Sequence, residues 1–152
     1  MSSHPIKRIM VATDFSEGSD AAMERAFELA RTLGASLDIV HVLDTALLAA
    51  PAALGAMPLV EPEALMSEID TALTARVEKA HQAGLVCQSD ALDGFPPKEI
   101  VRHAQKTGAD LIVVGTHGRT GVAHAIMGSV AERVVQRSSC PVLVIPPERR
   151  PN

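Results

Sequence analysis

The strongest constraint on the fold is a regular alternation between short apolar runs of strand length and longer stretches with helical spacing. Strands are expected at residues 6–12, 36–43, 85–91, 110–114 and 141–145, and helices at 17–33, 62–83, 94–108 and 129–138. Strands that alternate with helices typically form one parallel sheet with right-handed crossovers. We therefore predict an α/β fold with a doubly wound, five-stranded parallel sheet. It should form a single domain over residues 1–147, followed by a flexible tail at 148–152.

Single residues predict where the helices begin and end and which faces they bury. Ser16 is the expected N-cap of the first helix, and Gly34 and Gly108 are expected to end the first and third helices. The inner face of the first helix should comprise Ala22, Ala26, Leu29, Ala30 and Leu33. The inner face of the last helix should comprise Val130, Ala131, Val134, Val135 and Ser138. The polar residues of the strand at 85–91 suit an edge of the sheet.

Residues 46–62 are rich in Ala, Leu and Pro and carry almost no charge before Glu61. Three prolines argue against one continuous helix, so we expect a long loop with at most a helical turn. Loops of this length are usually functional or mobile, and a poorly ordered insertion is the alternative. The apolar composition suggests that the segment packs on this subunit or on a neighbour.

A glycine-rich stretch connects the fourth strand to the last helix, with glycines at positions 115, 118, 121 and 128. Glycine has no Cβ atom, so a ligand can approach the backbone closely, and positive φ angles are permitted. The amides of Gly128, Ser129 and Val130 lie at the expected start of the helix, where N–H groups lack intrahelical partners and bind anions. The stretch predicts a phosphate-binding loop, although a tight turn without a ligand would also use glycines.

The spacing of these glycines distinguishes the loop from two common phosphate-binding motifs. No Gly-Lys-Ser/Thr follows, as a P-loop requires, and the first two glycines are three residues apart rather than two. The pattern Gly115-x2-Gly118-x9-Gly128-Ser129 instead resembles the ATP-binding pattern of the universal stress protein family. The segments 9–16 (IMVATDFS) and 139–146 (SCPVLVIP) fit the same family, so the resemblance covers nearly the whole chain.

The resemblance implies a Rossmann-like sheet with the strand order 3-2-1-4-5. In that order the chain reverses direction between strands one and four, and ligands bind beyond the carboxyl ends of the strands at such a point. Asp14 and Gly115 would then face each other across a crevice. Cys87 and Cys140 would lie near opposite edges, roughly 19 Å apart at the usual strand spacing. A disulfide between them is therefore excluded, because it needs Cα atoms within about 7 Å.

The resemblance also implies a ligand, ATP with Mg²⁺ or alternatively AMP, and a set of residues that bind it. These residues are Ala12, Thr13, Asp14, Val42, Gly115, Thr116, Gly118, Arg119, Gly128, Ser129 and Val130. Val42 would bond adenine through its backbone. Asp14 would lie at the nucleotide or cap a helix, and Arg119 would reach the terminal phosphates or remain a solvated loop residue. Ala12 departs from some ATP-binding members, which have proline there.

The histidines give little indication of a metal site or a catalyst. His117 and His124 share the glycine-rich loop, but no carboxylate or cysteine completes a set of metal ligands there. His41 lies on a strand and is expected to be a packed residue. His4, His81 and His103 are expected at the surface.

Composition narrows the classes of function further. The net charge of −4 disfavours binding to a nucleic-acid backbone, and with no Trp or Tyr and three Phe, base-stacking residues are scarce. No apolar run approaches the roughly 18 residues of a membrane span, and no secretory signal is recognisable, so we expect a cytoplasmic protein. The two cysteines are expected to be reduced.

Three functions are compatible with these features. The first is a regulatory protein that binds an adenine nucleotide, forms a homodimer through residues 141–145 as family members commonly do, and is recognised by an unknown protein partner. The second is a nucleotide-free dimeric scaffold whose 46–62 segment binds a partner. The third is a slow ATPase, although the loop provides no evident base and one nearby arginine, Arg119. We assign no catalytic residues.

Overall fold

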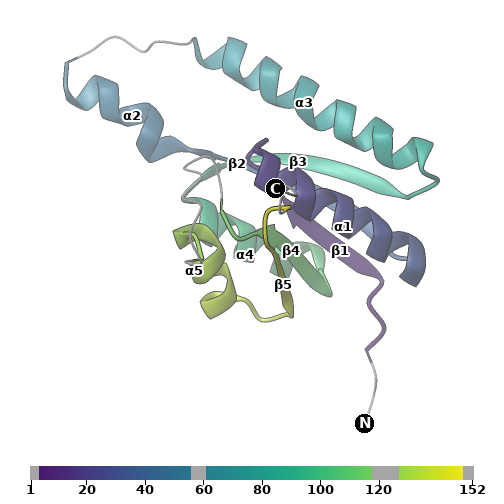
Figure 1. Ribbon diagram of the computed structural model, residues 1–152. Helices are drawn as coiled ribbons and strands as arrows, with labels where there is room; N and C mark the ends of the chain where they lie inside the picture. The colour runs from purple at the N-terminus through teal and green to yellow at the C-terminus, as the bar shows by residue number, and fades with distance from the viewer. Residues whose placement is uncertain (1–3, 56–60, 118–126, 149–152) are drawn as a thin grey trace.

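A five-stranded parallel sheet forms the centre of the computed structural model, which describes residues 4–55, 61–117 and 127–148. The strand order is β3-β2-β1-β4-β5, which confirms the order implied by the resemblance (Figure 1). The strands are β1 (Arg8–Ala12), β2 (Ser36–Asp44), β3 (Cys87–Gly94), β4 (Leu111–Gly115) and β5 (Val142–Ile145). The chain reverses between β1 and β4, so the carboxyl ends of these two strands lie next to each other.

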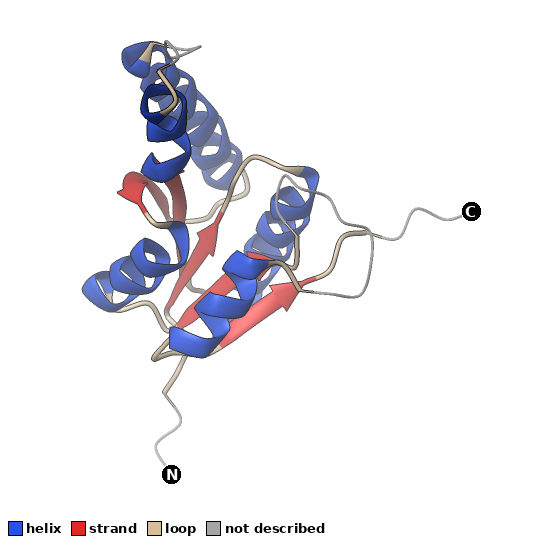
Figure 2. Cartoon of the chain, turned by 90° about the vertical axis from the view of Figure 1, so that its left-hand side faces the viewer, coloured by secondary structure: helices blue, strands red, loops and turns tan. Residues whose placement is uncertain are grey.

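Helices cover both faces of the sheet (Figure 2). They are α1 (Glu17–Leu33), α2 (Thr45–Ala53), α3 (Pro62–Gln82), α4 (Pro96–Thr107) and α5 (Ser129–Arg137). Apolar residues of α1 and α3 pack on one face, and those of α4 and α5 pack on the other. The fold is therefore a doubly wound α/β sandwich of three layers.

The central strands β1 and β4 are apolar over residues 9–12 and 111–114 because both of their faces are covered. Ile9 and Val11 are fully buried on the side of α1 and α3, and Met10 between them is fully buried on the side of α4 and α5. Ile112 and Val113 of β4 repeat the arrangement. This core fixes the carboxyl ends of β1 and β4, from which the loops of the candidate site emerge.

The predicted helix ends are confirmed. The side chain of Ser16 accepts a hydrogen bond from the amide of Ser19, 3.3 Å away, and so caps α1. Gly34 and Gly108 end α1 and α4 in the left-handed conformation, with φ of 64° and 67°. The third strand is an edge strand as predicted, but it runs two to three residues later than expected.

Three residues assigned to inner helical faces are instead exposed. Leu33 is 47% exposed at the end of α1, and Val130 and Val135 of α5 are 39% and 44% exposed. The helix α5 has nine residues and buries only Ala131 and Val134. A face of five buried residues was therefore too wide a prediction for this short helix, which packs near the edge of the sheet.

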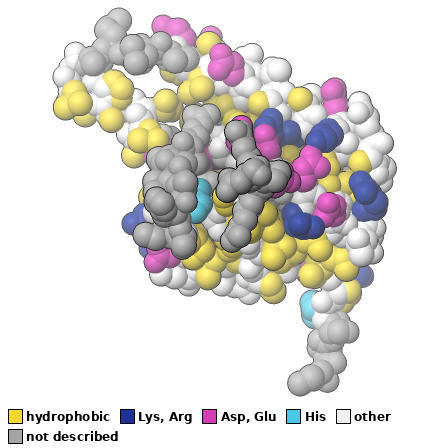
Figure 3. All heavy atoms as spheres, viewed as in Figure 1, with side chains coloured by type: hydrophobic (Ala, Val, Ile, Leu, Met, Phe, Trp, Pro, Cys, Tyr) yellow, Lys and Arg dark blue, Asp and Glu magenta, His cyan; other side chains and the backbone are white. Residues whose placement is uncertain are grey.

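Within the segment at 46–62, where a long loop was expected, the residues up to Ala53 belong to the helix α2, and residues 56–60 lie outside the described residues. The helix α2 is capped by Asp44, whose carboxylate accepts a hydrogen bond from the amide of Ala46 at 3.0 Å. Its Ala and Leu residues favour the helix strongly enough to accommodate Pro51 near its end. The helix buries none of its residues, and Leu47 is 72% exposed. Hydrophobic side chains of this helix accordingly gather at the upper left of the surface in Figure 3.

Two further expectations concern disulfides and membranes. Cys87 begins β3 at one edge of the sheet, whereas Cys140 lies two residues before β5 at the other edge, and both thiols are free. Among the described residues, no helix is both long enough and apolar enough to cross a membrane.

Candidate functional site

The loop after β4 touches the beginning of α1, although the two segments are about a hundred residues apart in the sequence. A Cβ atom on Gly115 would lie 2.9 Å from the carbonyl oxygen of Gly18, and one on Gly18 would lie 2.6 Å from the carbonyl oxygen of His117. Contacts shorter than 3.0 Å are not tolerated by a real Cβ atom. Both positions therefore require glycine for close backbone approach, and Gly18 is a residue that the sequence reasoning missed.

Gly128 serves a similar purpose at the start of α5. Its Cβ atom would lie 2.8 Å from the carbonyl oxygen of Thr116, and its own amide donates a hydrogen bond of 2.6 Å to that oxygen. We expected this amide to point toward a bound anion, whereas in the structure it is used by the carbonyl group of Thr116. The φ of Gly128 is −62°, so it is the absence of a side chain, rather than a positive φ, that this position uses.

The next two amides, those of Ser129 and Val130, occupy the first two positions of α5. N–H groups at these positions have no carbonyl partner within a helix, and the helix dipole adds positive potential. Both residues are exposed, and α5 has no side-chain cap. The start of α5 can therefore bind an anion through these two amides and the Ser129 hydroxyl.

On the other side of the crevice, Thr13 and Asp14 follow β1. Thr13 is 4% exposed, and its amide donates to the carbonyl oxygen of Val40 at 2.8 Å. The Asp14 carboxylate accepts a 3.0 Å bond from the amide of Ser16 and a short bond from the Ser16 hydroxyl. Asp14 thus positions the residue that caps α1 and is not itself the cap. This arrangement fixes the direction of its carboxylate at the carboxyl end of β1.

Three residues that the sequence reasoning did not assign to the site stabilise this turn. Phe15 has a φ of 65°, and its ring stacks on that of His41 with centroids 4.5 Å apart. The Arg76 guanidinium lies over the Phe15 ring, 4.8 Å from its centroid. His41 is buried, as predicted, and donates from Nδ1 to the carbonyl oxygen of Thr13 at 2.9 Å. Phe15 could not be assigned from the sequence, because its positive φ, which is rare for a bulky residue, is visible only in the structure.

The remaining predicted site residues are placed only in part. Ala12 ends β1 and pairs with Val40, and Val42 lies two residues further along β2, so both are at the carboxyl side of the sheet. Thr116 follows β4, and its amide donates to the carbonyl oxygen of Ile145 at 2.9 Å. Gly118 and Arg119 lie outside the described residues, as do Gly121 and His124.

His117 is the polar residue nearest to this contact between loops. Its Nδ1 lies 3.0 Å from the hydroxyl of Thr116, and within the described part of the chain its buried Nε2 has no hydrogen-bond partner. A buried polar atom without a partner is costly, so it favours the presence of a further group in the crevice.

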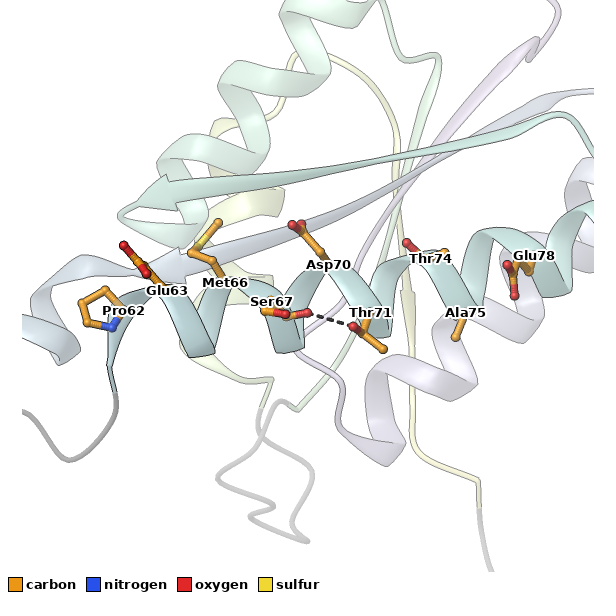
Figure 4. A pocket seen from close by; sticks show the side chains of 9 residues that line it. All are labelled: Pro62, Glu63, Met66, Ser67, Asp70, Thr71, Thr74, Ala75 and Glu78. Carbon is orange, nitrogen blue, oxygen red and sulfur yellow. Dashed lines mark hydrogen bonds between the residues drawn. The ribbon is translucent and has the colours of Figure 1, made fainter.

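A surface hollow also lies elsewhere, along α3 (Figure 4). It has a volume of about 770 Å³ and is lined by Pro62, Glu63, Met66, Ser67, Asp70, Thr71, Thr74, Ala75 and Glu78. All of these side chains project from one helix, and the hydroxyl of Thr71 donates to the carbonyl oxygen of Ser67 at 2.9 Å. A hollow with a single helix as its wall does not bring groups from different elements together, so the crevice between β1 and β4 remains the better candidate.

Comparison with known proteins identifies the family. The sequence model of the universal stress protein family matches residues 5–146. The universal stress protein MJ0531 of Methanocaldococcus jannaschii is 37% identical over 139 residues, which cover 91% of this chain and 81% of the relative. This chain belongs to the universal stress protein family.

Solved structures of universal stress proteins share the fold and include nucleotide complexes. One, in complex with cAMP, has a TM-score of 0.69 and 27% identity and covers 95% of this chain and 100% of its own. Another, from Archaeoglobus fulgidus in complex with dAMP, has a TM-score of 0.66 and 26% identity and covers 93% and 99%. Both of these universal stress proteins thus hold an adenine nucleotide with a single phosphate.

Proposed function

We propose that this universal stress protein binds an adenine nucleotide in the crevice between the carboxyl ends of β1 and β4. The observation that carries the proposal is the contact between the loop after β4 and the start of α1, which the small glycines permit. This contact supports a site formed by the exposed N-terminal amides of α5 and the carboxylate-bearing turn after β1. A phosphate chain fits the amides, and the fixed Asp14 carboxylate can accept from ribose or hold a metal-bound phosphate.

The role of each residue follows from what it offers. Ser129 and Val130 donate amides to phosphate, and Gly115 and Thr116 let the backbone approach the ribose. The adenine base is bound by Ala12, Thr13 and the backbone of Val42. The family resemblance adds Gly118, Gly128 and Arg119 to this set, together with ATP, Mg²⁺ and AMP as the ligands to compare.

Titration calorimetry of the freshly purified protein tests the proposal. Mg·ATP, AMP and Mg·GTP are titrated separately, and melting temperatures are recorded for the same samples. We expect saturable binding of one adenine nucleotide per chain and weaker binding of GTP. Absence of both heat and a thermal shift for ATP and AMP would contradict the proposal and favour a nucleotide-free scaffold.

We further propose that the protein acts in the cytoplasm as a homodimer through residues 141–145, with a regulatory role in stress. The strand β5 pairs only with β4 among the described strands, and all four of its residues are half-buried. Val130 and Val135 add exposed apolar surface on α5, the helix packed beside it. An uncovered, apolar edge strand is a pairing site for a second copy, and equilibrium sedimentation measures whether one binds.

A further inference from the structure

Three ionisable side chains from three different elements meet on the α4 face of the sheet, away from the nucleotide crevice. The Nε2 atom of His103 on α4 lies 3.0 Å from a carboxylate oxygen of Asp38 on β2 and 3.3 Å from one of Asp90 on β3. His103 was expected at the surface, but it is only 8% exposed, and Asp38 is 1% exposed. A charged residue buried within a largely apolar strand requires a partner, and His103 provides one for Asp38.

The charges within the cluster do not balance. Two carboxylates surround one imidazole, so the cluster is negative even when His103 is protonated. Within the described residues, the buried Oδ1 atom of Asp38 has no hydrogen-bond donor in normal geometry, and the Gln88 side chain is a neutral group that approaches this carboxylate. An orphaned, buried carboxylate oxygen beside a second carboxylate points to a cation.

The geometry suits a divalent metal ion. One ligand atom from each of the three side chains lies within 4.8 Å of the other two. Zinc bonds oxygen and imidazole nitrogen at about 2.0–2.2 Å, so the ligand atoms of a tetrahedral site lie about 3.3–3.6 Å apart. The separation of 3.3 Å between His103 and Asp90 agrees with this spacing, and the 3.0 Å between His103 and Asp38, which is the length of a hydrogen bond, would have to lengthen by a few tenths of an ångström.

The cluster is also accessible. Asp90 is 45% exposed at its side chain, which leaves room for water to complete the coordination from the outside of β3. A separate cavity of about 170 Å³ reaches Asp38 from the amino-terminal ends of the strands. Arg8 and Gln88 also line this cavity. Imidazole combined with carboxylates is a ligand set for transition metals such as zinc, rather than for Mg²⁺ or Ca²⁺.

We propose that Asp38, Asp90 and His103 form a binding site for a divalent transition-metal ion, with zinc as the expected metal. The ion fastens the edge strand β3 and the end of α4 to β2. It binds the folded chain alone, so it stabilises the fold in proportion to its concentration. The site is independent of the nucleotide, because its ligands lie at the amino-terminal half of β2, on α4 and on β3.

The test uses the full-length, tag-free protein after treatment with a chelator and removal of nucleotide. Zinc is titrated by calorimetry, cobalt is titrated by visible absorption, and the melting temperature is measured with and without zinc. We expect one ion per chain, a cobalt d–d band and a higher melting temperature. No stoichiometric binding of either metal would overturn the proposal and leave a plain Asp38–His103 pair.

Two variants of β3 locate the ion. Asp90→Asn changes a half-exposed ligand, so the fold should survive, and affinity for zinc should fall at least tenfold. Asp93→Asn removes the same charge from an exposed position on the opposite face of the same strand and should leave affinity unchanged. Equal affinities in both variants would place the metal elsewhere and refute the assignment. His103→Gln should abolish the cobalt band, provided that circular dichroism shows a folded chain.

Discussion

Replacing Ser129 with proline should weaken binding of ATP while leaving the fold intact. Ser129 is the first residue of α5, where proline is well tolerated because the amide that it lacks has no partner within the helix. Gly128 precedes it with φ of −62° and ψ of 155°, an extended conformation that a following proline prefers. The substitution therefore removes one backbone donor from the proposed phosphate site without disturbing the helix that presents it.

The size of the effect follows from the strength of a charged hydrogen bond. A bond from an amide to an ionised acceptor contributes about 1.5–3 kcal/mol. Its loss corresponds to about a 10- to 100-fold weaker affinity. Ser129→Ala is the matched control, because it removes the hydroxyl, as proline also does, and keeps the amide. The proline variant should therefore bind ATP about 10- to 100-fold more weakly than the alanine variant.

Calorimetry with Mg·ATP measures both affinities, and thermal melts followed by circular dichroism show that the two variants are folded. Equal affinities for the proline and alanine variants would refute the reasoning, since the amide would then not bind phosphate. Gly128→Val would be a poorer test. A side chain there collides with the carbonyl oxygen of Thr116, so lost binding would not distinguish a lost ligand contact from a distorted loop.

Three further predictions follow from particular residues. Val144→Pro removes an amide that points away from β4, so it should convert the proposed dimer to a monomer in equilibrium sedimentation. Val144→Thr keeps the amide and should remain dimeric, and identical behaviour of the two variants would exclude pairing through β5. Burial raises the pKa of Cys87 to about 11, and a nearby carboxylate adds a smaller effect. Iodoacetamide at pH 8 should therefore alkylate Cys87 about a hundredfold more slowly than an ordinary thiol. Equal labelling of Cys87 and the half-buried Cys140 in mass spectrometry would contradict this. The backbone amide of Lys7 holds the pKa of Asp110 below its ordinary value. Asp110→Asn should therefore lower the free energy of unfolding in urea at pH 7, and the difference between variant and parent should vanish as the pH falls through the folded-state pKa. A difference that persists at pH 2 would show that the charge is not the cause.

Much of the fold could be predicted because its signals are local. Apolar runs of strand length and the caps at Ser16 and Gly108 each depend on a few neighbouring residues. The helix α2 was missed because proline was given more weight than the surrounding Ala and Leu, although Pro51 stands where the helix is about to end. The exposure of Val135 was missed because periodicity shows which residues share a face, but not how wide a surface the helix meets.

Contacts between distant segments were beyond the sequence. Position 18 requires glycine because the carbonyl group of His117 lies close to it, and no local sequence pattern predicts this contact. His103 was assigned to the surface because histidine is polar, yet it stands three residues after Ile100 and directly before Ala104, on the buried face of α4. That spacing, together with the lone charge of Asp38 in an apolar strand, was the signal that could have predicted the cluster.

Mass spectrometry of the small molecules released by denaturing the freshly purified protein tests the central claim most directly, with Mg·ATP titrated into the stripped protein as the complement. The account predicts that an adenine nucleotide is released, or that the stripped chain binds one per site. If no nucleotide is released and the titration gives neither heat nor a thermal shift, the glycine-rich loop serves only to bring two segments of backbone together, and the proposed function is wrong.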